Sequence, residues 1–174
     1  TAITVDALNP AYSSLAGVLF DKAQTTLIQC PGAKSGTYAV PNGVTRIGAS
    51  AFYNCIGLTT VTIPSSVTSI ENETFWGCTG LTNLRIPGSV TNLGFAFPLC
   101  ANLGAVCFRG NAPAASAVFD GASKATVYYL PGTTGWGPTF AGRPTALWLP
   151  QVLTGDPYFG ARTNQFGFNI AWAS

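Results

Sequence analysis

The chain has 174 residues, of which 47% are hydrophobic and only 8% are charged, so its composition is that of a folded protein with one sizeable core. Its net charge of +2 comes from eight basic residues that are scattered singly, which excludes nucleic acid as an expected partner. No apolar stretch reaches the roughly 18 residues that a membrane-spanning helix needs, so we expect no membrane span. The abundance of Thr, Ser, Asn and Gly over Lys and Glu is typical of a β-rich extracellular protein.

The N-terminal segment, residues 1–37, is predicted to contain a hairpin that caps the rest of the fold. Its strands are expected around Val18–Phe20 and Thr26–Gln29. A stack of repeats leaves an open edge at each end, and this hairpin is expected to cover one of them.

Residues 38–131 contain an internal repeat with a period of 23 residues. Three copies superimpose: "PNGVTRIGASAFYNCIGLTTVTI" from Pro41, "PSSVTSIENETFWGCTGLTNLRI" from Pro64, and "PGSVTNLGFAFPLCANLGAVCF" from Pro87, which lacks one residue. In the two complete copies, the next Pro lies twelve positions after the repeat Phe. The same count from Phe119 to Pro131 predicts a fourth, degenerate copy.

The spacing within one copy predicts the shape of a coil. "LTTVTI" and "LTNLRI" alternate like half-buried strands, "VTSI" is a shorter extended piece, and "AFYNC" is a turn or a short helical corner. Because a unit of about 23 residues cannot bury its own apolar face, the copies must stack around a continuous core. The predicted fold is a β-rich solenoid of α/β-type repeats over residues 1–150, with an N-terminal hairpin cap and an irregular C-terminal cap.

The stretch "SVTSIENETFWGCTGLTNLRIP" resembles the leucine-rich repeats of the BspA type, a bacterial surface family with units close to V-x-x-I-x-x-x-A-F-x-x-C-x-x-L-x-x-V-x-I-P. The resemblance covers about residues 38–131. Residues 1–37 also resemble the family's usual entry segment, in which a hairpin like "GVLFDKAQTTLIQCP" interrupts the repeats. The family's Ala-Phe pair is kept as Ala51-Phe52, becomes Thr74-Phe75, and returns as Ala96-Phe97. The resemblance implies a secreted or surface-attached protein that serves adhesion or recognition.

Three of the five cysteines, Cys55, Cys78 and Cys100, occupy the same slot of the repeat, so stacking should place them about 4.8 Å apart. Such a line of sulfur atoms does not fit a tetrahedral zinc site and fits a disulfide torsion badly, so we expect free, buried thiols that fill space. Cys30 and Cys107 lie outside this slot. For each of them two interpretations stay open, a reactive or intermolecular thiol and a covered, inert one.

The chain contains no His, which excludes Ser-His, Cys-His and His-metal sites. Glu71 and Glu73 are the only close acidic pair, and a solvated loop is the favoured interpretation over a glycosidase-like pair. We therefore expect no enzyme, no cofactor and no metal.

Alternation along the main strands predicts an outward face that a partner can bind. The candidate residues are Thr60, Thr62, Asn83, Arg85, Cys107, Val127 and Tyr129. Solenoids use such faces for recognition, so the predicted partner is a protein or a glycan at a cell surface. The plainer alternative is a solvated sheet. A second row, Tyr53, Trp76 and Pro98, either stacks on a ligand or packs only on itself.

The C-terminal part divides into a cap and an unpartnered segment. Residues 132–150 are predicted to form the irregular cap, with Trp136, Phe140 and Trp148 as anchors. Residues 151–174 are predicted to be a linker and a β-strand, the start of a further β module, with alternating Phe166, Phe168, Ile170 and Trp172. This strand supports an alternative function, in which copies of the chain build an extracellular filament through solenoid edges and C-terminal strands.

Overall fold

The structure is a computed structural model that describes residues 2–115 and 117–148. Within this part the chain forms strands and turns, and no helix there is long and apolar enough to cross a membrane. The strands are β1 (Tyr12–Leu15), β2 (Val18–Asp21), β3 (Thr26–Gln29), β4 (Gly36–Ala39), β5 (Arg46–Ile47), β6 (Leu58–Thr62), β7 (Ser69–Ile70), β8 (Asn83–Ile86), β9 (Asn92–Leu93), β10 (Ala105–Phe108), β11 (Thr126–Tyr129), β12 (Thr139–Phe140) and β13 (Arg143–Leu147).

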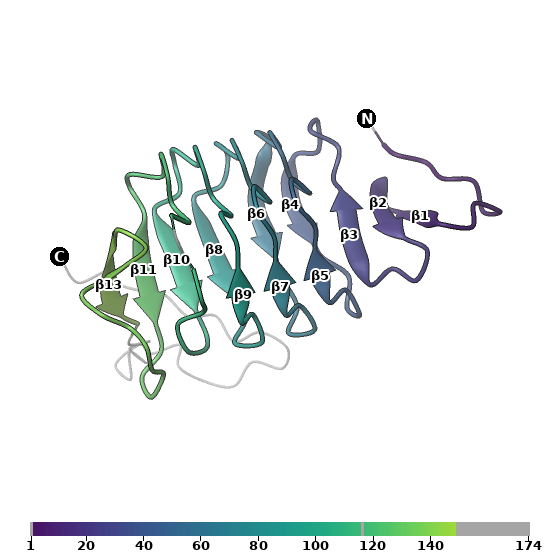
Figure 1. Cartoon of the computed structure of the whole chain (residues 1–174). Coiled ribbons are helices and arrows are strands. Elements are labelled where there is room, and N and C mark those ends of the chain that lie inside the picture. The colour runs from purple at the N-terminus through teal and green to yellow at the C-terminus, as the bar shows by residue number, and fades with distance from the viewer. Residues whose placement is uncertain (1, 116, 149–174) are drawn as a thin grey trace, which may run out of the picture.

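The strands form the two sides of a solenoid, as the repeat predicts (Figure 1). On one side, which we call the main sheet, β4, β6, β8, β10, β11 and β13 follow one another, and the paired neighbours are parallel. On the other side, the minor sheet, the two-residue strands β5, β7 and β9 pair in parallel behind β3. Three coils therefore each contribute one shorter and one longer strand: β5 with β6, β7 with β8, and β9 with β10.

The corner between the two sheets is a turn rather than a helix. Positive φ angles recur there at matching positions of successive coils: Ser50 (55°) and Glu73 (58°) before the repeat Phe, and Asn54 (52°), Gly77 (66°), Leu99 (56°) and Gly121 (71°) two residues after it. A left-handed residue interrupts helical geometry, because L-residues form helices only with negative φ. This resolves the prediction of "a turn or a short helical corner" in favour of the turn.

The core is built around a column of phenylalanine rings, one from each coil. Phe52 stacks on Phe75 with 5.1 Å between ring centroids, and Phe97 lies 5.5 Å from both Phe75 and Phe119. All four side chains are buried. The Phe position of the repeat, assigned from the sequence, is therefore a core position in all three copies that superimpose.

The two ends of the solenoid are built differently. The predicted N-terminal hairpin is present as β2 and β3, and β1, which the sequence analysis did not predict, adds to it in antiparallel fashion. This hairpin continues the minor sheet, so β4 remains the N-terminal edge of the main sheet. At the C-terminal end β12 and β13 form a small hairpin, and β13 joins the main sheet parallel to β11.

The fourth coil departs from the predicted register. Val127 lies opposite Val106 on β10, an inward position, and it is fully buried. Tyr129 lies opposite Phe108, also inward, and stacks on Trp136 of the cap at 5.3 Å. The prediction that Val127 and Tyr129 face outward is therefore wrong.

A one-residue deletion explains this error. In the third coil three positions lead from Leu103 to Val106, whereas in the fourth only two lead from Ala125 to Val127. Because side chains alternate along a strand, a shift of one residue turns all of them to the other face. An extra residue, Leu130, then restores the spacing to the next Pro, so counting from Phe to Pro does not reveal the deletion.

Candidate binding face

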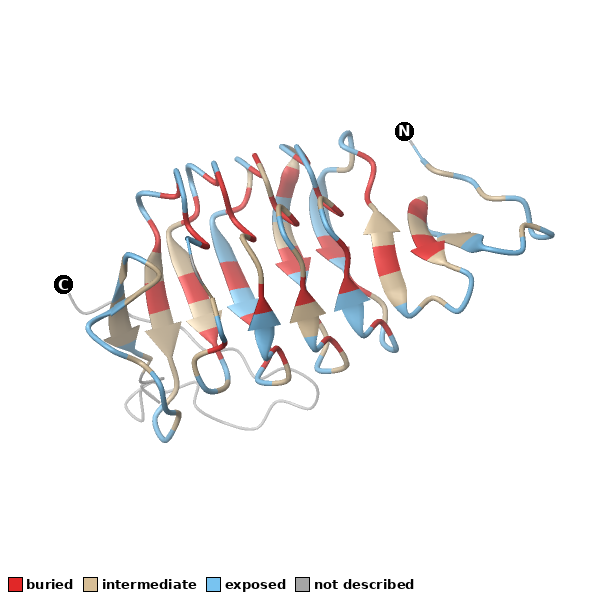
Figure 2. Ribbon diagram, in the orientation of Figure 1, coloured by how far each residue is buried: buried red, intermediate tan, exposed pale blue. Residues whose placement is uncertain are grey.

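The outward positions of β6, β8 and β10 are occupied as the alternation predicts. Along β8, Asn83 and Arg85 are exposed while Leu84 and Ile86 are buried, and Figure 2 shows these alternating bands. Thr60 and Cys107 are half-buried, and Thr62 is exposed. These residues come from three successive coils, so parallel stacking brings them into rows on one face.

A groove crosses this face between β6 and β8. The hydrogen-bonded ladder of the main sheet is interrupted there, since β4 and β6 form one sheet and β8 begins the next. The groove has a volume of about 550 Å³, and its polar and charged lining consists of Thr60, Thr62, Ser65, Asn83, Arg85 and Arg109. Four predicted face residues therefore meet at one place, whereas Cys107 does not line it.

Arg109 is the groove residue that sequence reasoning missed. It follows the last residue of β10, in the slot that Pro64 and Pro87 occupy after β6 and β8. An arginine where the repeat has a proline is a departure that could have drawn attention to it. The structure places it at the same groove as Arg85, although the two belong to successive coils.

The charge of this groove is not balanced by acidic side chains. The sequence contains no Asp or Glu between residues 74 and 119, and none between 22 and 70. Arg85 instead lies over the ring of Trp148, with 5.8 Å from the guanidinium carbon to the ring centroid. Such a contact orients the guanidinium without neutralising it.

Cys107 lies beside Arg85 in the neighbouring strand. Burial raises the pKa of its thiol above the ordinary value, and the charge of Arg85 opposes this shift only in part. A protonated thiol is a poor nucleophile, so the structure favours the inert interpretation of Cys107 over the reactive one.

All five cysteines are free, and four of them form a column in the core. The thiol of Cys78 donates to the carbonyl of Phe52 at 3.0 Å, and that of Cys100 donates to the carbonyl of Phe75 at 2.9 Å. Burial raises the pKa of Cys100 to about 12. Cys30 is also fully buried next to Cys55, so it extends the predicted column of three cysteines by a fourth. This burial favours the interpretation of Cys30 as a covered, inert thiol.

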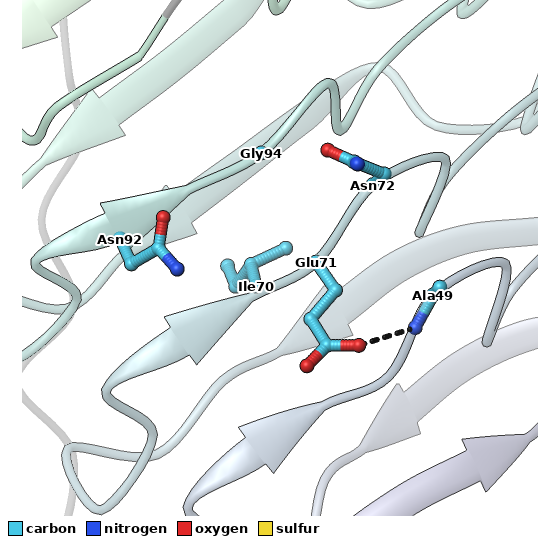
Figure 3. A pocket seen from close by; sticks show the side chains of 6 residues that line it. All are labelled: Ala49, Ile70, Glu71, Asn72, Asn92 and Gly94. Atoms are coloured by element: carbon cyan, nitrogen blue, oxygen red, sulfur yellow. Dashed lines mark hydrogen bonds between the residues drawn. The ribbon is translucent and has the colours of Figure 1, made fainter.

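The minor-sheet side carries a second hollow of about 340 Å³, shown in Figure 3. Of its polar side chains, Asn72 accepts from the Phe95 amide at 3.0 Å, and Asn92 donates to the Ser69 hydroxyl at 3.4 Å. The carboxylate of Glu71 accepts a hydrogen bond from the Ala49 amide at 3.1 Å and pairs with Arg46 at 3.1 Å. The carboxylate of Glu73 accepts from the Ser50 hydroxyl at 3.3 Å. These acids therefore connect neighbouring coils.

The corner aromatics contact one another. The rings of Tyr53 and Trp76 stack at 6.2 Å, and Phe95, which was not in the predicted row, meets Trp76 edge-on at 6.2 Å. Because each ring already has an aromatic neighbour, mutual packing accounts for this row without a ligand.

The sequence matches the model of a known repeat family over residues 32–133, described as BspA type leucine rich repeat region, in six copies. The chain belongs to this BspA-type leucine-rich repeat family. The match confirms the resemblance carried by the Ala-Phe and Cys slots. No curated protein matches the sequence.

Three solved structures share the fold of this BspA-type chain. A leucine-rich repeat protein from Eubacterium ventriosum is 28% identical, with a TM-score of 0.66 over 74% of this chain and 36% of that one. A leucine rich cell surface protein from Faecalibacterium prausnitzii is 23% identical, with a TM-score of 0.54 over 74% and 41%. The pneumococcal vaccine antigen PcpA is 17% identical, with a TM-score of 0.52 over 75% and 45%. The chain thus spans less than half the length of each.

Proposed function

We propose that this BspA-type repeat region is a non-enzymatic recognition or adhesion module, secreted or attached to a cell surface, that binds a protein or glycan through the outward face of its main sheet. The observation that carries the proposal is the groove between β6 and β8, where side chains from successive coils converge. The description of one structural relative as a cell surface protein supports the location.

The groove distinguishes this face from an evenly solvated sheet. The hydroxyls of Thr60 and Thr62 and the guanidinium of Arg109 form no hydrogen bond within the described residues, so they are available to a ligand. On the minor sheet, by contrast, the Thr45 and Thr68 hydroxyls donate to carbonyls of the preceding coil. Polar groups without internal partners, gathered in a concave place, are what a binding site requires.

The test is a binding measurement on a panel of immobilised glycans and extracellular proteins. Thr62→Trp fills the groove with a bulky side chain, and Thr91→Trp places the same side chain on the minor-sheet side, where Thr91 is exposed. We expect Thr62→Trp to weaken binding by about tenfold or more and Thr91→Trp to leave it unchanged. Equal binding by both variants, or no binding by the parent chain, would contradict the proposal.

Open strand edges support a second candidate, a structural subunit of an extracellular filament. Within residues 2–115 and 117–148, β4 pairs with β6 on one side only, and β12 covers only the first residues of β13. Unpaired edges accept further strands from other chains. The predicted assembly strand, with Phe166, Phe168, Ile170 and Trp172, lies outside the described residues.

A further inference from the structure

We infer that the groove between β6 and β8 binds an anionic polysaccharide, with its carboxylates held by Arg85 and Arg109 and its hydroxyls by the neighbouring polar groups. The inference rests on the proposed function and names the chemical class of its ligand.

The basic residues of the described chain fall into two groups. Five of them donate to an acceptor of the protein itself: Lys22 to Ala7 at 3.0 Å, Lys34 to Ala16 at 3.0 Å, Arg46 to Glu71 at 3.1 Å, Lys124 to Asn102 at 3.1 Å and Arg143 to Ser123 at 2.9 Å. The guanidinium groups of Arg85 and Arg109 have no hydrogen-bond or ion-pair partner in that part of the chain. Both residues are exposed and line the same groove, so their donors are available to a ligand.

The chemistry of these two groups indicates a carboxylate or a similar anion. The guanidinium group is planar and presents two parallel N–H donors that match a carboxylate. Stacking on Trp148 holds Arg85 in place, which lowers the conformational entropy lost when a ligand binds. Two such groups on successive coils suit a polymer with repeated negative charges better than a single small anion.

The remainder of the lining favours a carbohydrate over a protein segment. Thr60, Thr62 and Asn83 offer hydroxyl and amide groups, and the interrupted ladder leaves main-chain donors and acceptors beside them. Five apolar residues also line the groove, and four of them are buried while the fifth, Pro64, is half-buried: Val61, Ile63, Pro64, Leu84 and Pro87. Protein partners are usually anchored by apolar or aromatic side chains in pockets, and this groove provides no apolar pocket of that kind in the described face.

The test is calorimetric titration of the full chain with oligogalacturonate, a polymer of uronic acid. Neutral dextran of similar length and poly-glutamate serve as comparison ligands. We expect oligogalacturonate to bind and dextran not to bind. Binding should weaken about tenfold in roughly 1 M NaCl, where screening shortens electrostatic interactions to about 3 Å.

Matched variants locate the site. Arg85→Gln and Arg109→Gln should each weaken oligogalacturonate binding about fivefold or more, and the double variant should abolish it. Lys124→Gln removes the same charge from a residue outside the groove and should change binding less than about twofold. Equal thermal unfolding midpoints confirm that all variants are folded.

Three results would overturn the inference: no binding of oligogalacturonate, equal binding of dextran, or tighter binding of poly-glutamate, which would identify an acidic protein segment instead. Unchanged binding by the double arginine variant would do the same. If Thr62→Trp still abolishes binding of a panel ligand while oligogalacturonate fails, the proposed recognition face stands and only the anionic class is wrong.

Discussion

The side chain of Phe75 is enclosed by phenylalanine rings from the coils before and after it. Its ring lies 5.1 Å from that of Phe52 and 5.5 Å from that of Phe97, and its side chain is fully buried. The neighbouring Thr74 replaces the family's Ala and is also fully buried. Its hydroxyl oxygen lies 2.7 Å from the carbonyl oxygen of Glu71 and 3.1 Å from that of Gly48, so its single proton has an acceptor within hydrogen-bond distance.

We predict that Phe75→Ala lowers the free energy of unfolding by about 3–5 kcal/mol, because it opens a cavity in the phenylalanine column and removes two ring contacts. Urea denaturation monitored by circular dichroism measures the change. Ile56→Ala is the control, since Ile56 is 62% exposed and its truncation should cost less than about 0.5 kcal/mol. A loss below about 1 kcal/mol for Phe75→Ala would show that the register of the column is wrong.

At the scale of the coil, the decisive quantity is the distance between neighbouring turns of the solenoid. Gly80 precedes the repeat Leu of its coil, and a Cβ atom there would lie 2.4 Å from the carbonyl oxygen of Ile56 and 2.6 Å from that of Leu58. These are main-chain atoms of the preceding coil, which cannot turn aside as a flexible side chain can. Glycine is thus required by close approach of the main chain.

We predict that Gly80→Ala destabilises the chain by more than about 2 kcal/mol, because two coils must separate to admit one methyl group. Gly104→Ala is the matched control: its Cβ would lie 3.7 Å from the nearest atom, the carbonyl oxygen of Thr82, an ordinary contact. The control should cost less than about 1 kcal/mol in the same thermal or urea unfolding experiment. Similar losses for the two variants would refute the close approach.

For the whole molecule, the main question is whether the open edges of the main sheet stay free or join copies of the chain. The hairpin of β1, β2 and β3 extends the minor sheet, so it leaves β4 as an edge of the main sheet. Paired with only one neighbour, such a strand can accept another, and the C-terminal strand predicted from the sequence is a candidate donor.

If copies assemble in this way, the purified full chain should form large particles in light scattering, and removal of residues 158–174 should convert them to monomers. The double substitution Ile170→Asp and Trp172→Asp should have the same effect without shortening the chain, because charges on a pairing strand oppose burial. A monomer whose size does not respond to either change would exclude assembly and favour the recognition module alone.

The sequence by itself determined the repeat period, the phenylalanine and cysteine columns and the outward rows on β6, β8 and β10. In a solenoid each residue meets its counterpart one period away, so the sequence pattern is also the contact pattern. The resemblance to the BspA-type family added the expectation of a surface protein, which stays a prediction.

Only the tertiary structure decided where this regularity fails. The inward register of Val127, the interrupted ladder between β6 and β8 and the meeting of Arg85 with Arg109 and Trp148 each depend on contacts between coils. The hydrophobic pattern of the sequence does not report such contacts. A one-residue deletion, or an interruption of the hydrogen-bonded ladder, leaves the spacing of the apolar residues almost unchanged. The candidate site lies at these departures, because the interrupted ladder and the arginine in the proline slot gather polar groups without internal partners in one groove.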